Sequence, residues 1–170
     1  MVEIFKNFLT EEECKILTEI SFYCVQSSVT NEKRLTSRIK MHGNKYPQDV
    51  IDISNKIRKF MKIDHYPIID GPGSDGIVVS IIYPGGELHK HKDSRQPLNE
   101  SLCYRCNIMT QSPDEGGILY VSDKPVDINV GDLHCYYASE HTHYVTKVEG
   151  NTPRVLWMFG AFIPCNNLNS

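Results

Sequence analysis

The residues best suited to chemistry lie in one short run, residues 83–93, with the sequence YPGGELHKHKD. Its His91 and Asp93 form a His-x-Asp pair, and residues two apart in an extended chain point to the same face. An imidazole and a carboxylate can therefore reach one metal ion together. Two ligands do not complete a site, and His143, in the downstream segment 141–148 (HTHYVTKV), is the best candidate for the third.

Two histidines and one carboxylate on one side of an octahedron, with the other side open, form the ligand set of non-haem Fe(II) oxygenases. Spacing alone leaves an alternative at each position. His89 competes with His91, although it would share a face with His91 rather than with the carboxylate. His141 competes with His143, and Asp93 also suits the role of a turn-capping residue after a strand.

The sequence around these residues resembles a known family, the Fe(II)/2-oxoglutarate-dependent dioxygenases, and especially its prolyl 4-hydroxylase-like branch. The first run is similar to the tyrosine–glycine–apolar–His-x-Asp motif of that family. A second segment is similar to its distal histidine and its 2-oxoglutarate-binding arginine, and two glycine-containing turns lie between them in the family's order. The resemblance covers residues 76–164 and rests on Tyr83, Gly86, Leu88, His91 and Asp93; Glu115, Gly116 and Gly117; Gly131 and Asp132; and His143, Val145, Val148, Gly150 and Arg154.

The resemblance implies an enzyme that hydroxylates an unactivated C–H bond. Its Fe(II) would be bound by His91, Asp93 and His143, since the His-x-Val-x-x-Val pattern favours His143 over His141. Arg154 would bind the distal carboxylate of 2-oxoglutarate. O2 and 2-oxoglutarate would be cosubstrates that yield succinate and CO2, with ascorbate as an accessory reductant. The protein would supply geometry and a dry pocket, because the hard chemistry belongs to the iron and the cosubstrate.

Arg154 also stands out without the resemblance, because the apolar run 155–159 follows it. A buried guanidinium needs a counter-charge, which a bound carboxylate could supply through a bidentate contact. A structural ion pair with an acidic residue is the alternative. Arg105 and Asn107 alternate on one face of a strand and could add a second carboxylate contact, as in the aspartyl/asparaginyl hydroxylase branch of the family. Tyr83 could line the pocket or belong to the core.

The pattern after residue 76 predicts eight short strands separated by turn signals, which indicates a sandwich or barrel. We expect a mainly β fold, a double-stranded β-helix (cupin-like jelly roll) behind N-terminal helices. The His-x-Asp strand and the His143 strand should lie side by side at one mouth. The expected strands are about 76–83, 87–93, 104–111, 118–121, 126–130, 133–137, 142–148 and 154–163.

The first 75 residues are predicted to support this core with two helices. Thr10 and Glu13 form a capping box, and a helix with one apolar stripe should run from there to Cys24. Pro47 suits the first position of a second helix. Segment 27–44 predicts a solvated loop with a short strand or, alternatively, a basic substrate-facing segment. The apolar positions of the second helix that should face the sheet are Val50, Ile53, Ile57 and Phe60 or Met61.

Length and composition are those of a single globular domain spanning residues 1–170. The net charge of −3 gives no reason to expect nucleic acid or an acidic membrane as a partner. No apolar stretch is long enough to cross a bilayer and the N-terminus lacks signal-peptide architecture, so we expect a cytoplasmic protein. The six cysteines should then be free thiols. Cys103 and Cys106 should face opposite sides of a strand rather than form a zinc or redox site.

Substrate choice is set by loops rather than by metal ligands, and no loop here carries a recognisable motif. The resemblance favours a prolyl or other amino-acid residue of a peptide or protein. A free amino acid or another small metabolite is the alternative within the same chemistry. A metal-binding cupin-like module without oxygenase activity is the alternative from a different class, and it would have no use for Arg154.

Overall fold

The computed structural model describes residues 1–24, 28–31, 33–39, 47–66, 77–93 and 100–166. Within them the chain forms antiparallel β-structure with two helices near its N-terminus, which confirms the predicted fold class. The helices are α1 (Glu11–Cys24) and α2 (Gln48–Phe60). The strands are β1 (Glu3–Phe5), β2 (Ser28–Asn31), β3 (Arg34–Ile39), β4 (Ile77–Ile82), β5 (Leu88–His91), β6 (Ser101–Gln111), β7 (Glu115–Gly116), β8 (Leu119–Val121), β9 (Lys124–Pro125), β10 (Leu133–Tyr137), β11 (His143–Val145), β12 (Val148–Glu149) and β13 (Arg154–Pro164).

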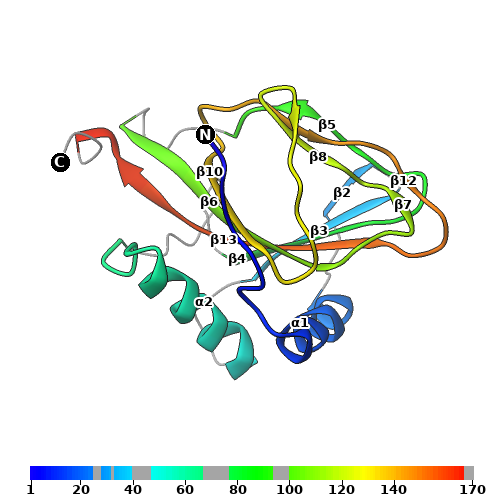
Figure 1. Cartoon of the computed structure of the whole chain (residues 1–170), viewed down its shortest axis with the longest axis horizontal. Coiled ribbons are helices and arrows are strands. Elements are labelled where there is room, and N and C mark those ends of the chain that lie inside the picture. Colours follow the sequence, from blue (N-terminus) through cyan, green and yellow to red (C-terminus); the bar gives the residue numbers. More distant parts are fainter. Residues whose placement is uncertain (25–27, 32, 40–46, 67–76, 94–99, 167–170) are drawn as a thin grey trace.

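Two sheets make up most of the molecule. The larger has the strand order β1-β10-β6-β13-β4-β3-β2 and the smaller has the order β5-β11-β8-β9, while β12 and β7 form a separate pair. Both helices lie on one side of the larger sheet and the smaller sheet lies on the other (Figure 1). The larger sheet is therefore covered on both faces, which explains why nearly every residue of its central strands β4, β6 and β13 is buried.

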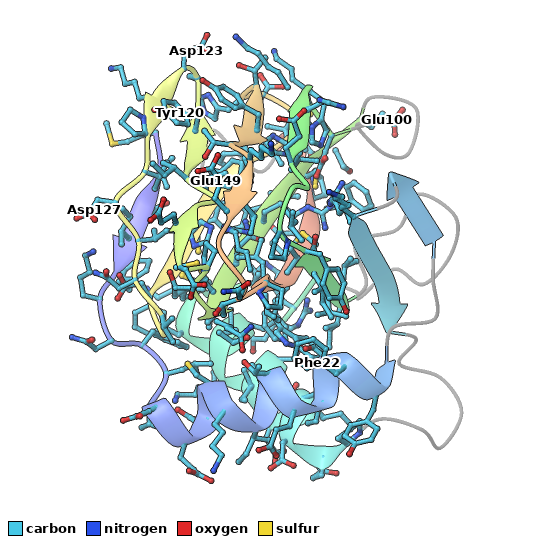
Figure 2. The ribbon with its side chains drawn as sticks, turned by 90° about the vertical axis from the view of Figure 1, so that its right-hand side faces the viewer. Phe22, Glu100, Tyr120, Asp123, Asp127 and Glu149 are labelled. Atoms are coloured by element: carbon cyan, nitrogen blue, oxygen red, sulfur yellow. The ribbon has the colours of Figure 1, made fainter. Side chains whose placement is uncertain are left out.

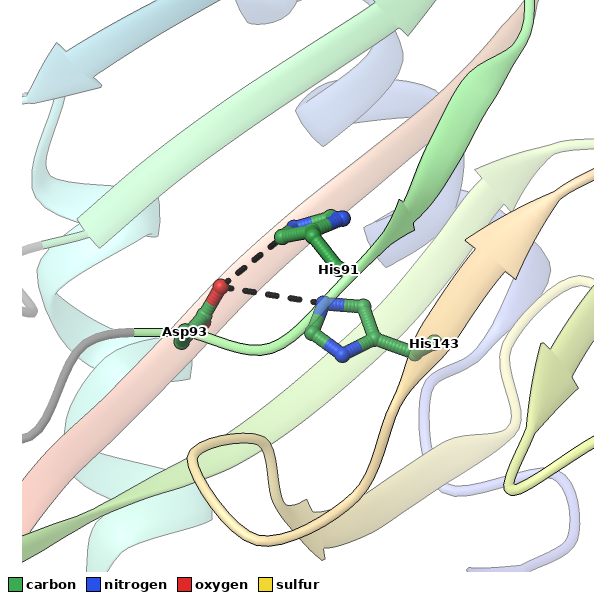
Figure 3. A group of neighbouring side chains, drawn as sticks. All are labelled: His91, Asp93 and His143. Atoms are coloured by element: carbon green, nitrogen blue, oxygen red, sulfur yellow. Dashed lines mark ion pairs between the residues drawn. The ribbon is translucent and has the colours of Figure 1, made fainter.

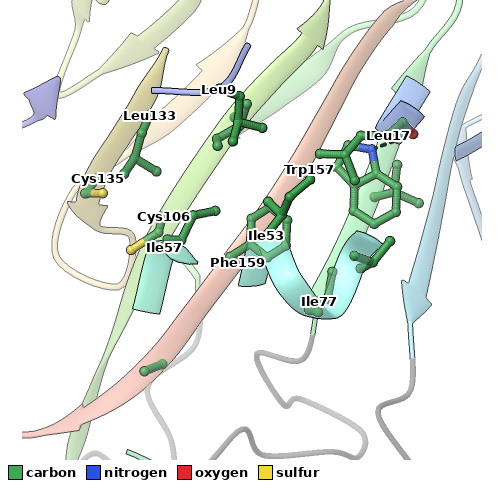
Figure 4. Close-up of a cluster of buried hydrophobic side chains, with 14 of the residues drawn as sticks. Leu9, Leu17, Ile53, Ile57, Ile77, Cys106, Leu133, Cys135, Trp157 and Phe159 are labelled. Carbon is green, nitrogen blue, oxygen red and sulfur yellow. Dashed lines mark hydrogen bonds between the residues drawn. The ribbon is translucent and has the colours of Figure 1, made fainter. Parts of the chain in front are cut away.

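The larger core cluster lies between the larger sheet and the helices. It contains Val79 of β4, Trp157 of β13, Leu17 of α1 and Ile57 of α2, all fully buried. The Trp157 indole Nε1 donates a hydrogen bond to the Leu17 carbonyl oxygen over 3.1 Å, which attaches α1 to the centre of the sheet (Figure 4). Each buried side chain of this size contributes about 1.5–3 kcal/mol, so this face supplies much of the stability.

The smaller core cluster lies between the two sheets. Ile82 and Cys103 come from the larger sheet, whereas Val121 and Val145 come from the smaller one, and all four are buried. The β8–β9 hairpin closes this layer, with Asp123 at its tip, at the end of the molecule remote from α1 and its exposed Phe22 (Figure 2). Apolar side chains therefore fill part of the space between the sheets.

Both predicted helices are present. The Thr10 hydroxyl accepts a hydrogen bond from the N–H of Glu13, whose carboxylate accepts one from the N–H of Thr10, as the capping box predicted. The second helix begins at Gln48 rather than Pro47, because Pro47 keeps an extended conformation (ψ 132°) and acts as the N-cap. Of the two residues expected at the last sheet-facing position, Met61 packs against the larger core cluster, whereas Phe60 lies half exposed against the ring of Phe5 of β1. Val50, Ile53 and Ile57 are buried as expected.

Two strand predictions are wrong. Residues 126–130 form no strand. Val126 donates one backbone hydrogen bond to the Leu119 carbonyl oxygen, and the partly buried side chains of Val126 and Ile128 pack against the smaller core cluster, so their alternation reflects partial burial without a ladder. The described part of segment 27–44 contains two strands where a solvated loop with one short strand was expected. Strands β2 and β3 form a hairpin that extends the larger sheet beyond β4. This addition matters because it brings the start of β3 to the space between the sheets.

No helix in the described ranges is long and apolar enough to span a membrane. Cysteines 14, 103, 106, 135 and 165 are free thiols, as predicted. Cys103 belongs to the smaller core cluster and Cys106 to the larger one, so they face opposite sides of β6. This agrees with the prediction that the Cys-x-x-Cys pattern is not a paired site.

Candidate metal centre

His91 and His143 lie on neighbouring strands of the smaller sheet. Strands β5 and β11 are antiparallel and His143 is directly opposite His91, which confirms that these strands lie side by side. A turn at Gly85, whose φ of +85° suits glycine, carries the chain from β4 in one sheet to β5 in the other. Asp93 follows the end of β5, where its N–H donates a hydrogen bond to the Ala138 carbonyl oxygen over 3.0 Å.

Three donor atoms converge at this place (Figure 3). Oδ1 of Asp93 lies 3.5 Å from Nε2 of His91 and 3.7 Å from Nε2 of His143. Metal bonds of about 2.1 Å at right angles place neighbouring donors about 3 Å apart, so a small movement would close the group around an ion. Nδ1 of His91 lies 2.7 Å from the carbonyl oxygen of His89, and Nδ1 of His143 lies 3.2 Å from that of His141. A hydrogen on each Nδ1 leaves each Nε2 free to bind a metal.

The electrostatics of the group favour an ionised carboxylate. Burial raises the pKa of Asp93, but the hydrogen bond with His91 and the positive charge of Arg105 outweigh burial and hold that pKa far below its ordinary value. Nε of Arg105 donates to Oδ2 of Asp93 over 2.8 Å, so the two carboxylate oxygens have different neighbours. The hydrogen bond to Asp93 raises the pKa of His91, whereas burial lowers the pKa of His143. The group therefore offers one anionic and two imidazole donors.

The competing histidines lie outside this group. The side chain of His89 is exposed, with Nδ1 3.4 Å from a Glu87 carboxylate oxygen. The His141 ring lies between the Ser122 hydroxyl, at 3.0 Å, and the N-terminal amine, at 3.2 Å. His134 is fully buried in β10. Within the described residues, only His91, Asp93 and His143 form a cluster of three groups that could hold a metal ion.

A cavity of about 190 Å³ adjoins the three side chains, and Arg154 lines it. Arg154 is 1% exposed, and its Nε and Nη2 have no hydrogen-bond partner among the described residues. Burial lowers its pKa from 12.5 to about 10. The structural ion pair considered as the alternative is therefore not seen in the described part of the chain. A buried guanidinium with no acidic partner among the described residues fits a cavity whose occupant carries a carboxylate, as 2-oxoglutarate does.

Gly116 and Gly117, of the Glu-Gly-Gly turn, make room beside Arg154. Both have positive φ angles, 66° and 62°. A Cβ on Gly116 would lie 2.0 Å from the Lys147 carbonyl oxygen, and a Cβ on Gly117 would lie 3.2 Å from Cδ of Arg154. The two glycines thus allow β7 and β12 to approach closely and leave space for the arginine's aliphatic stem.

The three other residues predicted to line the site lie on different faces of the larger sheet. Arg105 and Asn107 line the cavity, and Oδ1 of the buried Asn107 has no partner among the described residues. Tyr83 is not among the lining residues. In β4, even-numbered residues such as Ile82 face the cavity, and odd-numbered residues such as Ile81 face the larger core. Tyr83 comes directly after β4 and continues this alternation. Its ring packs against the larger core cluster, the alternative that the sequence left open.

Arg34 lines the same cavity, although the sequence indicated only a basic segment around it. Across the larger sheet, Arg34 of β3 lies opposite Ile82 of β4, which in turn lies opposite Arg154 of β13. Residues paired in this way point to the same face. Nε of Arg34 donates to the Ser80 hydroxyl oxygen over 3.2 Å. No local signal distinguishes this arginine from a solvated one, because its environment depends on where the hairpin joins the sheet.

Comparison with known proteins shows which class this fold belongs to. Neither a protein-family model nor a curated protein matches the sequence. Among solved structures, a Pseudomonas putida prolyl-4-hydroxylase is similar with a TM-score of 0.70 and 14% identity, over 96% of this chain and 92% of that one. The viral collagen prolyl hydroxylase of Paramecium bursaria Chlorella virus 1, in complex with 2-oxoglutarate, is similar with a TM-score of 0.68 and 16% identity, over 94% of this chain and 95% of that one.

A Trichoplax adhaerens prolyl hydroxylase, in complex with a peptide fragment of the hypoxia inducible factor oxygen degradation domain, gives a TM-score of 0.63 and 16% identity, over 93% of this chain and 83% of that one. At these identities the likeness shows a shared fold. This chain therefore has the fold of the prolyl hydroxylases, as the sequence resemblance implied.

Proposed function

We propose that this protein is an Fe(II)- and 2-oxoglutarate-dependent dioxygenase that hydroxylates an unactivated C–H bond, in the first instance of a prolyl residue in a peptide or protein. The observation that carries the proposal is the convergence of His91, Asp93 and His143 beside a cavity lined by the buried Arg154, two of whose guanidinium nitrogens have no partner among the described residues. The prolyl-hydroxylase fold supports it, and so does the peptide bound by the Trichoplax adhaerens enzyme.

Each residue of the site would have one task. His91 and His143 would bind Fe(II) through Nε2 and Asp93 through Oδ1, while Arg105 holds the other oxygen of Asp93 in place. Arg154 would bind and orient the distal carboxylate of 2-oxoglutarate. The bound iron and cosubstrate would supply the oxidising chemistry that converts C–H and O2 to C–OH while 2-oxoglutarate becomes succinate and CO2.

The apolar part of the cavity wall would keep water away from the reacting groups. Val78 of β4, Leu119 of β8 and Leu156 of β13 line the cavity and are buried. Exclusion of water strengthens the ionic contacts inside and limits side reactions. We further propose that residues 1–170 act as one catalytic domain. A cytoplasmic location would suit the free thiols of the described cysteines.

The visible spectrum of the anaerobic protein with Fe(II), before and after addition of 2-oxoglutarate, tests the proposal. A metal-to-ligand charge-transfer band should appear only with both, disappear in His91→Ala and weaken in Arg154→Ala. His89→Ala is the matched control, because that imidazole is exposed and should leave the band unchanged. Absence of the band in metal-loaded wild-type protein would refute the 2-oxoglutarate proposal and favour a metal-binding cupin-like module.

A further inference from the structure

The cavity contains more positive charge than the proposed reaction needs. Among the described residues, three arginines line it, Arg34, Arg105 and Arg154, together with one carboxylate, that of Asp93. Arg105 is bonded to that carboxylate, and under the proposed function Arg154 is assigned to the distal carboxylate of 2-oxoglutarate. A divalent metal ion and the 2-oxoglutarate dianion cancel each other's charge. The filled cavity would therefore keep two positive charges without counter-charges from the described residues, which is unfavourable where water is scarce.

Arg34 is the arginine for which the proposed reaction has no task. Its Nε donates to the Ser80 hydroxyl, which orients the guanidinium without neutralising it. No carboxylate of a described residue lies within ion-pair distance of it. Burial lowers the pKa of Arg34 and the charge of Asp93 partly offsets this, so the guanidinium lies in the field of the metal site.

The position of Arg34 in the cavity separates its role from that of Arg154. Arg154 is 1% exposed, whereas Arg34 is partly exposed, so Arg34 lies nearer the solvent from which a substrate enters. The two residues are two strands apart in the larger sheet, which separates their backbones by about 10 Å. Each guanidinium can thus bind a different carboxylate.

We propose that Arg34 binds a carboxylate of the primary substrate, so that the substrate is a free amino acid or a peptide segment with an acidic group close to the hydroxylated carbon. This inference rests on the proposed function and adds the chemical class of the substrate. A guanidinium held at Nε by Ser80 presents its two terminal nitrogens, which match the two oxygens of a carboxylate. That carboxylate would neutralise the charge of Arg34.

Two matched probe pairs test the inference on the anaerobic Fe(II)·2-oxoglutarate protein. The first pair is L-proline against L-prolinamide, and the second is acetyl-Gly-Pro-Asp-amide against acetyl-Gly-Pro-Asn-amide. Binding is followed as a change in the charge-transfer band, and hydroxylated product by mass spectrometry in air. In wild-type protein, the carboxylate member of one pair should bind at least about 10-fold more tightly than its neutral partner. The pair that shows the preference identifies the source of the carboxylate.

Three variants identify the residue responsible. Arg34→Gln should abolish the preference while the band with 2-oxoglutarate stays unchanged, and Arg34→Lys should keep part of it. Lys147→Gln is the matched control, because it removes one positive charge from an exposed residue that does not line the cavity. The preference should persist there.

Several results would overturn the inference and leave the oxygenase in place. They are equal binding within both pairs, no binding of either carboxylate probe, or a preference that survives Arg34→Gln. Loss of the 2-oxoglutarate band in Arg34→Gln would also overturn it, since Arg34 would then serve the cosubstrate. A wild-type protein without the band would refute the proposed function itself.

Discussion

Replacement of Arg154 by methionine should stabilise the empty protein and at the same time prevent tight binding of 2-oxoglutarate. Methionine has a similar length and is apolar, so it fills the space of the arginine stem without a charge. In the empty protein the guanidinium is buried and two of its nitrogens have no partner among the described residues. Removal of the guanidinium therefore eliminates an unfavourable buried charge from the empty protein, and it also eliminates the contact with 2-oxoglutarate in the complex.

The structure sets the size of both effects. Burial lowers the pKa of Arg154 from 12.5 to about 10, which corresponds to about 3 kcal/mol against the charged form. We expect the empty Arg154→Met protein to gain about 1–3 kcal/mol, or about 2–4 °C in Tm for each kcal/mol. Loss of one partner of a buried charge pair costs about 2–5 kcal/mol in binding, which raises the Kd of 2-oxoglutarate by a factor of about 30 to about 5,000.

Thermal unfolding without metal, and with Mn(II) and 2-oxoglutarate, measures both effects, and calorimetry gives the Kd. At 100 times the wild-type Kd, the cosubstrate should stabilise wild-type protein by about 2.7 kcal/mol and the variant by less than about 1 kcal/mol. A variant less stable than wild type when empty would refute the argument, because Arg154 would then have a structural partner. Undiminished stabilisation by 2-oxoglutarate would refute it equally.

Arg58→Met is the matched control for this prediction. Arg58 is also buried, at 5% exposed, but its guanidinium donates to the backbone carbonyl oxygens of Gly160, Asp64 and Tyr66. Its replacement leaves those acceptors without donors, so the empty protein should lose about 1–3 kcal/mol. The Kd of 2-oxoglutarate should stay unchanged, in contrast to Arg154→Met.

Two further predictions concern pH. Burial lowers the pKa of His134 from 6.5 to about 3, so its contribution to stability is complete above pH 6.5 and is lost as the pH falls. In urea unfolding, the free energy of unfolding of His134→Leu should fall by about 3 kcal/mol less than that of wild type between pH 7 and pH 4. An identical pH dependence of the two proteins would contradict this. Burial raises the pKa of Asp132, but backbone N–H groups and Lys6 bring it below 3.8, so its stabilisation is present above about pH 4. Asp132→Asn should cost about 1–3 kcal/mol at pH 7 and less at pH 3, and a difference independent of pH would contradict the assignment.

Local patterns, together with the family resemblance, were sufficient to predict the kind of fold and the residues of the candidate metal centre. The His-x-Asp spacing at His91 and Asp93 is a statement about one face of an extended chain, and the structure places these two donors beside His143. The capping box at Thr10 and the apolar stripe of the first helix are equally local. Such features depend on residues a few positions apart, and they keep their meaning in any tertiary context.

Local patterns failed where a pattern had two physical causes. The alternation of residues 126–130 suits a strand, but it equally suits a loop that partly buries two side chains, and the latter is what forms. Residues 34–39 look solvated in isolation, yet they pair with β4 and extend the sheet. Backbone hydrogen bonds decide both cases, and they require a partner strand that the segment itself does not contain.

The sequence by itself determined the class of fold and indicated the three side chains that converge at the candidate metal centre and the arginine that lines the adjoining cavity. Only the tertiary structure decided that Arg34 shares the cavity with Arg154, that Arg105 bonds to Asp93, and that Tyr83 faces the core. The reason is that these contacts depend on strand order and register. A shift of one residue in register moves a side chain to the opposite face of a sheet, and register is set by pairing between segments far apart in the chain.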